Sequence, residues 1–184
     1  MGRPRPWTEY EQNALGFAML LGIEPQARYR KFFRAAERGA DRIGVVTGDT
    51  EVTNQIVQTL VLWRVMIHPD TCVAVCHGRP DEGKRWIREV EEMVATGDEG
   101  LHKELLFAQD KTAIQRVGFP GWNVATCSPD LLVNSSSPLR HHRGEARPIV
   151  VVLDPVDLVG RERLEVIVAM KPDLLICTNR HLMV

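Results

Sequence analysis

Residues 48–55 read Gly-Asp-Thr-Glu-Val-Thr-Asn-Gln, and their place in the chain is that of a phosphate-binding loop. An apolar strand-like run, residues 43–46, precedes them, and an apolar helical run, residues 56–63, follows. A phosphate-binding loop, G-x-x-x-x-G-K-[ST], surrounds phosphates with backbone N–H groups at a helix N-terminus. Its lysine contacts the phosphates and its hydroxyl contacts Mg²⁺. The pattern predicts a strand, a loop that begins at Gly48 and a helix, in the order that a nucleotide site requires.

The three most diagnostic positions of this loop carry other residues. Thr53 stands at the second glycine, Asn54 at the lysine and Gln55 at the hydroxyl. Loss of the lysine removes a charge-assisted contact to phosphate that is worth about 1.5–3 kcal/mol. An amide oxygen is also a poor substitute for a hydroxyl in the tight octahedral shell of Mg²⁺. Because Asp49 and Glu51 place negative charge where a triphosphate would lie, efficient ATP hydrolysis is not expected.

Asp154 is the candidate for the second half of a nucleotide site. It follows the apolar run 149–153 and precedes Pro155. In ATPases of the additional-strand class, such a strand ends in Asp-Glu. The Asp holds the water shell of Mg²⁺, and the Glu polarises the attacking water. Pro155 stands at the Glu position and has no side-chain base. Two interpretations of Asp154 stay open: a remnant of a Mg²⁺ site, which the loop upstream favours, and an acid that caps the turn after a strand.

Strand and helix patterns alternate along the chain. Strands are predicted at residues 42–46, 71–76, 114–117, 122–126, 149–153 and 174–177, and helices at 7–21, 26–38, 54–67, 81–96, 101–107 and 160–170. This alternation predicts an α/β fold with a mainly parallel sheet flanked by helices, like a P-loop NTPase of the additional-strand class. Strands 42–46 and 149–153 are apolar runs, so we expect them close together in the centre of the sheet. We expect a single domain over residues 1–184, with a basic extended arm at residues 1–6.

The composition excludes several classes of protein. With 44% hydrophobic and 26% charged residues, the chain is an ordinary soluble globular protein, and its net charge of −1 gives no basic field that would favour nucleic acid. The longest apolar stretches are too short to span a bilayer, and no signal peptide is expected. Cys72 and Cys76 would share one face of a strand, with His77 on the other. This arrangement favours buried thiols over metal ligation, so no metal site is predicted.

Four further segments have the order and flanks of a known family. Residues 22–26 (Gly-Ile-Glu-Pro-Gln) lead into a helix before the first strand, and Leu-Val-Leu-Trp at 60–63 is followed by His-Pro-Asp at 68–70. A basic helix with a tryptophan covers residues 84–90, and a strand ends in the small-polar turn 176–179 (Ile-Cys-Thr-Asn). With the Asp154 strand, these segments resemble the ATPase domain of the phage large terminase, the motor that packages DNA into procapsids. The resemblance covers nearly the whole chain.

This resemblance implies further site residues. Gln26 and Tyr29 match the stretch that contacts adenine in the family, and Arg79 lies where related motors present an arginine to a neighbouring subunit. From the residues alone, Gln26 and Tyr29 fit equally well a surface amide and a half-buried aromatic on an amphipathic helix. A lone arginine in a Gly-Arg-Pro turn is more often solvated. The resemblance implies ATP and Mg²⁺ as cofactors of an active site, but the replaced residues predict that none is bound.

Two functions are consistent with these observations. The first is a non-hydrolysing structural or adaptor component of a phage that keeps the ATPase-like fold, and the replaced residues favour it. The second is a viral DNA-packaging ATPase, the ATPase module of a terminase large subunit, and the retained Asp154 favours it. The resemblance implies a homo-oligomer or a phage structural protein as partner, contact with double-stranded DNA, no membrane, and a place in the host cytoplasm or the phage particle. The nuclease domain of the family is not expected here.

Overall fold

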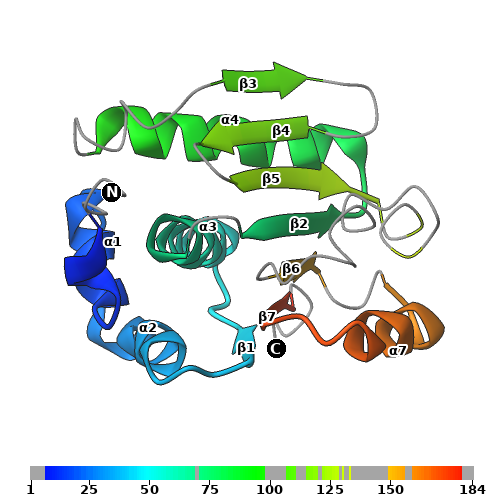
Figure 1. Ribbon diagram of the computed structural model, residues 1–184, viewed down its shortest axis with the longest axis horizontal. Helices are drawn as coiled ribbons and strands as arrows, with labels where there is room; N and C mark the ends of the chain where they lie inside the picture. Colours follow the sequence, from blue (N-terminus) through cyan, green and yellow to red (C-terminus); the bar gives the residue numbers. More distant parts are fainter. Residues whose placement is uncertain are drawn as a thin grey trace, which may run out of the picture.

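A seven-stranded sheet forms the centre of the described part of the chain (Figure 1). The computed structural model describes residues 7–68, 71–97, 107–110, 115–119, 122–128, 130, 133, 149–155 and 159–179. The strands are β1 (Arg42–Val45), β2 (Cys72–His77), β3 (Phe107–Asp110), β4 (Gln115–Phe119), β5 (Trp122–Cys127), β6 (Ile149–Asp154) and β7 (Leu174–Thr178). Their order is β1-β7-β6-β2-β5-β4-β3. The five strands β1, β7, β6, β2 and β5 are parallel to one another, whereas β4 and β3 pair antiparallel at the end of the sheet. The predicted mainly parallel sheet is therefore confirmed.

Helices cover both faces of this sheet, as predicted. The helical elements are η1 (Thr8–Tyr10), α1 (Ala14–Leu20), η2 (Ala27–Tyr29), α2 (Arg30–Glu37), α3 (Thr50–Ile67), α4 (Pro80–Thr96) and α7 (Arg161–Ala169). The first four α-helices pack on the face that carries Val150 and Val152, and α7 packs on the face that carries Val151 and Leu153. Successive residues of a strand point to opposite faces, so the apolar run of β6 serves both layers.

β1 lies at the edge of the described sheet, not beside β6 in its centre. The prediction that strands 42–46 and 149–153 lie close together in the centre is therefore wrong, because β7 separates them. In β1, buried Ile43 and Val45 alternate with exposed Arg42 and Gly44, which is the pattern of a strand with one covered face. β7 thus lies between the strand that leads to Gly48 and the strand that ends at Asp154.

The first two predicted helices are shorter than expected. Residues 7–21 form η1 and then α1, because Asn13 Oδ1 accepts the N–H of Gly16 at 2.8 Å and caps a new helix there. Residues 26–38 form η2 followed by α2. The predicted helix 101–107 does not include Phe107, which begins β3. The basic arm at residues 1–6 lies outside the described residues.

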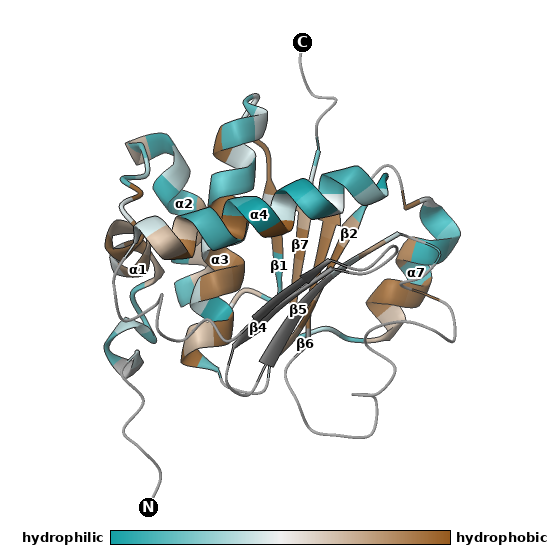
Figure 2. Cartoon of the chain, turned by 90° about the horizontal axis from the view of Figure 1, so that it is seen from above, coloured by the Kyte–Doolittle hydropathy of each residue, from teal (hydrophilic) through white to brown (hydrophobic). Residues whose placement is uncertain are grey.

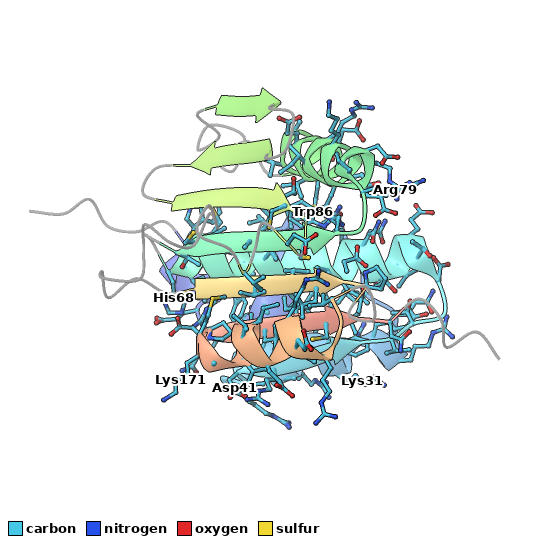
Figure 3. The ribbon with its side chains drawn as sticks, turned by 90° about the vertical axis from the view of Figure 1, so that its right-hand side faces the viewer. Lys31, Asp41, His68, Arg79, Trp86 and Lys171 are labelled. Carbon is cyan, nitrogen blue, oxygen red and sulfur yellow. The ribbon has the colours of Figure 1, made fainter. Side chains whose placement is uncertain are left out.

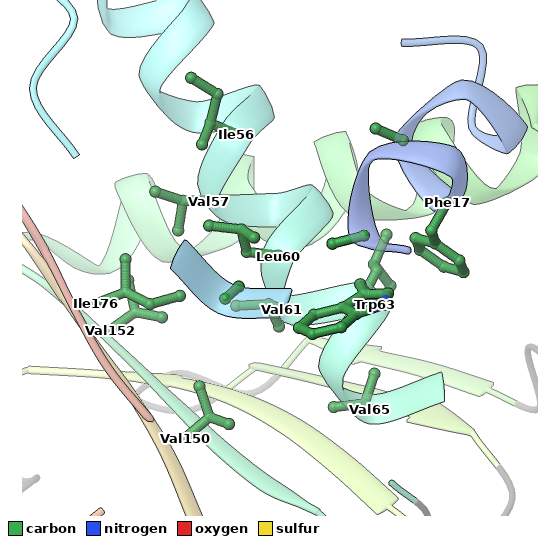
Figure 4. Packing of buried hydrophobic residues seen from close by; sticks show 14 of the residues in the cluster. Phe17, Ile56, Val57, Leu60, Val61, Trp63, Val65, Val150, Val152 and Ile176 are labelled. Atoms are coloured by element: carbon green, nitrogen blue, oxygen red, sulfur yellow. The ribbon is translucent and has the colours of Figure 1, made fainter. Parts of the chain in front are cut away.

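α3 is buried on nearly all sides and fixes the part of the fold that matters for the site. Leu60, Val61 and Leu62 are fully buried, and Trp63 packs towards α1 (Figure 4). The indole N–H of Trp63 donates to the backbone oxygen of Tyr10 at 2.7 Å. Each fully buried aliphatic side chain contributes about 1.5–3 kcal/mol, so α3 is held firmly between the sheet and α1. Its N-terminus follows β1 at the carboxyl edge of the sheet.

The hydropathy of the residues along each element agrees with this layering. Figure 2 shows apolar residues concentrated on the central strands and on α3, whereas the outer face of α4 is hydrophilic. The inner face of α4 carries Trp86, which is only 2% exposed, as is Trp63, so both tryptophans are core residues. No helix in the described ranges is long and apolar enough to cross a membrane.

Candidate functional site

Three polar side chains meet at the carboxyl ends of three neighbouring strands. His77 ends β2, Asp154 ends β6 and Thr178 ends β7, and His77 and Asp154 are register partners. The hydroxyl of Thr178 donates to Asp154 Oδ1 at 2.5 Å, and His77 Nδ1 lies 3.6 Å from Asp154 Oδ2. All three side chains are at least 96% buried, with exposed fractions of 4%, 3% and 1%. Asp154 thus occupies the predicted position, but its carboxylate faces other protein groups.

Sequence reasoning missed His77 and the pairing of Thr178 with Asp154. The available signal was that each of these residues ends an apolar strand at the same sheet edge, as Asp154 does. Parallel strands bring their carboxyl ends together, so polar residues at those positions can converge. The prediction that His77 lies opposite Cys72 and Cys76 is confirmed, because its ring centroid lies 6.3 Å from that of Trp86 on the α4 side.

The segment between β1 and α3 is shorter than the predicted phosphate-binding loop. β1 ends at Val45 and α3 begins at Thr50, so only residues 46–49 connect them. Gly48 has φ 77°, the left-handed conformation that glycine adopts without strain. The predicted order of strand, loop and helix is present, but the helix predicted at residues 54–67 begins four residues earlier, because Asp49 caps it: its carboxylate accepts the N–H of Val52 at 3.1 Å.

The hydroxyls of Thr47 and Thr53 form hydrogen bonds across this short connection. The hydroxyl of Thr47 donates to the backbone oxygen of Asp49 at 2.7 Å, and its oxygen accepts the N–H of Asp49 at 3.1 Å. Thr53 lies in the first turns of α3 at 7% exposure, and its hydroxyl is 2.7 Å from that of Thr47. The position predicted for a loop glycine is thus a buried helical residue.

Asn54 and Gln55 also lie on α3 and face the neighbouring helix α4. Both line a cleft between α3 and α4, and Asn54 additionally borders a narrow gap that Asp154 and His77 line from the other side. The structure therefore brings Asn54 and Asp154 to one gap, but this gap is too narrow for a water molecule. Gln55 does not border it.

The residues of this edge do not fit a Mg²⁺–triphosphate. A helix N-terminus attracts anions through its unpaired N–H groups and its dipole, and here the carboxylate of Asp49 already takes that position. Glu51 in the first turn of α3 adds a second negative charge. Asp154 accepts the hydroxyl of Thr178 and faces His77, so it is not presented to a metal ion's water shell. Among the described residues, no group of three or more His, Cys, Asp or Glu side chains could hold a metal ion.

Gln26 and Tyr29, the predicted adenine contacts, line neither the gap nor the α3–α4 cleft. Gln26 is exposed and precedes η2, and its Oε1 accepts the Nε–H of Arg28 at 3.1 Å. Tyr29 is 5% exposed, with the Arg28 guanidinium 4.6 Å from its ring centroid. The exposed position of Gln26 agrees with its interpretation as a surface amide, whereas Tyr29 is more deeply buried than the half-buried aromatic of that interpretation.

Arg79 lies at the N-terminus of α4, near the carboxyl end of β2 (Figure 3). Its side chain is 70% exposed and points away from the sheet, and its guanidinium nitrogens lie 3.4 Å from Asp81 and 3.9 Å from Glu82. These exposed ion pairs are weak, so the arginine is solvated in this chain and accessible to a neighbouring molecule.

The cysteines form part of the core beneath α7. Cys72, Cys76 and Cys127 pack on the same face of β2 and β5 with Ala74. Burial, with a smaller contribution from Asp154, raises the pKa of Cys76 from its usual 9.0 to about 12. Burial likewise raises the pKa of Cys127. Burial thus favours the protonated form of Cys76 and Cys127.

Strand order and layering together define the class of this fold. A parallel sheet in which β7 lies between β1 and the Asp154 strand, with helices on both faces, is the P-loop NTPase-like fold of the additional-strand class. Among solved structures, the chain is similar to an ATPase-domain variant of the large terminase of Thermus Phage P74-26. The TM-score is 0.53 and the identity 14%, over 89% of this chain and 68% of that one.

This likeness confirms, at the level of the fold, the resemblance to the phage large terminase ATPase domain that the sequence indicated. No family model matches the chain, and no curated protein matches it. At 14% identity the likeness concerns the fold and not the chemistry of the site. The chemistry that this chain can perform depends on its own residues at the carboxyl edge of the sheet.

Proposed function

We propose that this chain is a non-hydrolysing structural or adaptor component of a phage that uses the terminase ATPase fold as a scaffold. The observation that carries the proposal is the position of Asp49. Its carboxylate accepts the N–H of Val52 at the start of α3, where a nucleotide phosphate would have to bind. A phosphate group there would have to displace the carboxylate and would then meet the charge of Glu51 as well.

The other half of the site supports the same proposal. Asp154 is held by Thr178 and His77 inside the protein, and Pro155 takes the place of a general base. Phosphoryl transfer depends on a placed metal ion, a placed water and charge stabilisation. The residues at this edge supply none of the three, so the proposed role rests on binding other molecules.

The partners in this proposal are inferred from the terminase-like fold. We propose a homo-oligomer or a phage structural protein as the binding partner, within the host cytoplasm or the phage particle. The exposed Arg79 is the candidate contact to a neighbouring subunit or to double-stranded DNA. Bound ATP and Mg²⁺ have no part in this role.

The proposal is tested by titrating the purified chain with a fluorescent ATP analogue, with and without Mg²⁺, and by following phosphate release with and without double-stranded DNA. We expect no saturable Mg²⁺-dependent binding and no release above the protein-free rate. Robust Mg²⁺-dependent release that Asp154→Asn abolishes, and that the exposed control Asp81→Asn leaves unchanged, would overturn it. Far-UV circular dichroism must show that both variants are folded, because Asp154 is buried.

That contrary result would establish the alternative, the ATPase module of a DNA-packaging motor. The observation that favours this alternative is the convergence of Asn54 and Asp154 on one gap. A motor would have to widen this gap and release the cap of Asp49 before it could bind Mg²⁺ and triphosphate. Release stimulated by double-stranded DNA would be the expected sign of that rearrangement.

A further inference from the structure

A cleft of about 650 Å³ lies between α3 and α4, on the side of α3 that faces away from β1. Figure 2 shows α4 lying beside α3, and the side chains of Gln58 and Glu89 join the two helices. The apolar side chains that line the cleft, here called its apolar floor, are Leu21 and Ile23, which follow α1, and Met93 of α4. The cleft is separate from the narrow gap at Asp154, although Asn54 borders both.

The walls of the α3–α4 cleft carry an excess of negative charge. Glu51, Glu89 and Glu92 line it, against a single cation, Arg85, which gives a formal charge of −2. The Nε of Arg85 lies 3.5 Å from Glu89 Oε1, so these two charges offset each other. In the part of the chain that the structure describes, Glu51 and Glu92 have no ion-pair partner. An anionic ligand would therefore be repelled and a cation attracted.

Gln58 adds a neutral hydrogen-bond acceptor to the lining of this cleft. Its side chain lines the cleft and is only 2% exposed. The amide Nε2 donates to Glu89 Oε2 at 2.8 Å, which fixes the orientation of the group. The amide oxygen accepts no hydrogen bond from any described residue. A ligand that carries N–H groups could donate to this oxygen.

We propose that the α3–α4 cleft binds a polyamine, a chain of methylene groups that carries two or more ammonium ions. The methylene groups would lie on Leu21, Ile23 and Met93, and the ammonium ions would contact the carboxylates and the oxygen of Gln58. An ammonium ion has three donors and no acceptor, which suits a wall of acceptors. This inference is independent of the proposed structural role, because none of its contacts involves Asp49 or Asp154.

The test is isothermal titration calorimetry of the whole chain at fixed ionic strength with spermidine, putrescine, butylamine, MgCl₂ and Nα-acetyl-lysine amide. We expect saturable one-to-one binding of spermidine, weaker binding of putrescine and still weaker binding of butylamine. The double variant Glu51→Gln, Glu92→Gln removes charge with little change of shape from two exposed positions. It should weaken spermidine binding about tenfold. The control variant Glu162→Gln, Glu165→Gln, on α7 across the sheet, should bind as the unmodified chain does.

Three outcomes would overturn the proposal. Equal weakening by the α7 control, or binding that does not saturate, would show general attraction of cations to an acidic protein. Displacement of spermidine by MgCl₂ at equal ionic strength would show that the apolar floor contributes nothing. Binding of Nα-acetyl-lysine amide as tight as that of spermidine would assign the cleft to a lysine of a protein partner, not to a free polyamine. Titration with ATP should give no signal at this cleft in any variant.

Discussion

Replacing Asp49 with alanine removes the group that we infer to occupy the anion position of α3. The variant loses the hydrogen bond from Val52 N–H to the carboxylate, whose length is 3.1 Å, and it loses a negative charge at the helix N-terminus. Loss of an N-cap side chain costs about 1 kcal/mol, and the charge at the helix dipole adds about 0.3–1 kcal/mol. We therefore expect Asp49→Ala to lower the free energy of unfolding by about 1–2 kcal/mol. Asp49→Asn keeps the cap and should lose only about 0.5 kcal/mol.

Urea unfolding followed by circular dichroism measures this difference. With an m value of about 2 kcal/mol/M, the midpoint of Asp49→Ala should fall by roughly 0.5–1 M. Repeating the series in sulfate and in chloride at equal ionic strength tests the anion position directly. Sulfate should stabilise Asp49→Ala more than the unmodified chain, because only the variant leaves the N–H groups of α3 open to it.

Asn13→Ala is the matched control for this experiment. Asn13 caps α1 through a hydrogen bond of 2.8 Å from the N–H of Gly16, so its loss should also destabilise the protein. The start of α3 is unchanged in this variant, and sulfate should give it no added benefit over the unmodified chain. If Asp49→Ala is as stable as the unmodified chain within about 0.5 kcal/mol, or if sulfate acts equally on all variants, the proposed role of Asp49 is refuted.

Two further predictions concern the buried groups near the sheet edge. Thr178→Val removes the hydroxyl that donates to Asp154, and because Asp154 is buried and hydrogen bonds to charged groups are strong, we expect a loss of about 1.5–3 kcal/mol in urea unfolding. Burial raises the pKa of Cys76 from 9.0 to about 12. The protonated thiol thus contributes stability that is fully present below pH 9 and is lost as the pH rises towards 12. We therefore expect the urea midpoint, measured in the presence of reductant, to fall between pH 8 and pH 11.

Conservative variants separate these effects from general disruption. Thr178→Ser keeps the hydroxyl and should retain most of the stability that Thr178→Val loses; equal losses would show that the hydroxyl is not the cause. Cys76→Ala should reduce the fall of the urea midpoint at alkaline pH, because the alanine has no proton to lose. An unchanged decline in this variant would assign the pH dependence to other groups, and the argument from Cys76 would fail.

The sequence by itself determined the layers of this protein. Apolar runs of strand length between amphipathic helices are sufficient to predict a mainly parallel sheet covered on both faces, because burial of apolar side chains dominates folding. The sequence also predicted that a working nucleotide site is absent, because Asn54, Gln55 and Pro155 differ from the lysine, hydroxyl and glutamate of the motif.

Only the tertiary structure decided which strands are neighbours and how the site is closed. The place of β1 at the sheet edge depends on its pairing with β7, more than a hundred residues later, which no local pattern encodes. The early start of α3 was not predicted because the motif spacing implied a longer loop. In the structure, the N-cap residue Asp49 ends this loop after four residues. The meeting of His77, Asp154 and Thr178, and the cleft beside α3, arise because separate elements pack against one another, and that packing is a property of the whole chain.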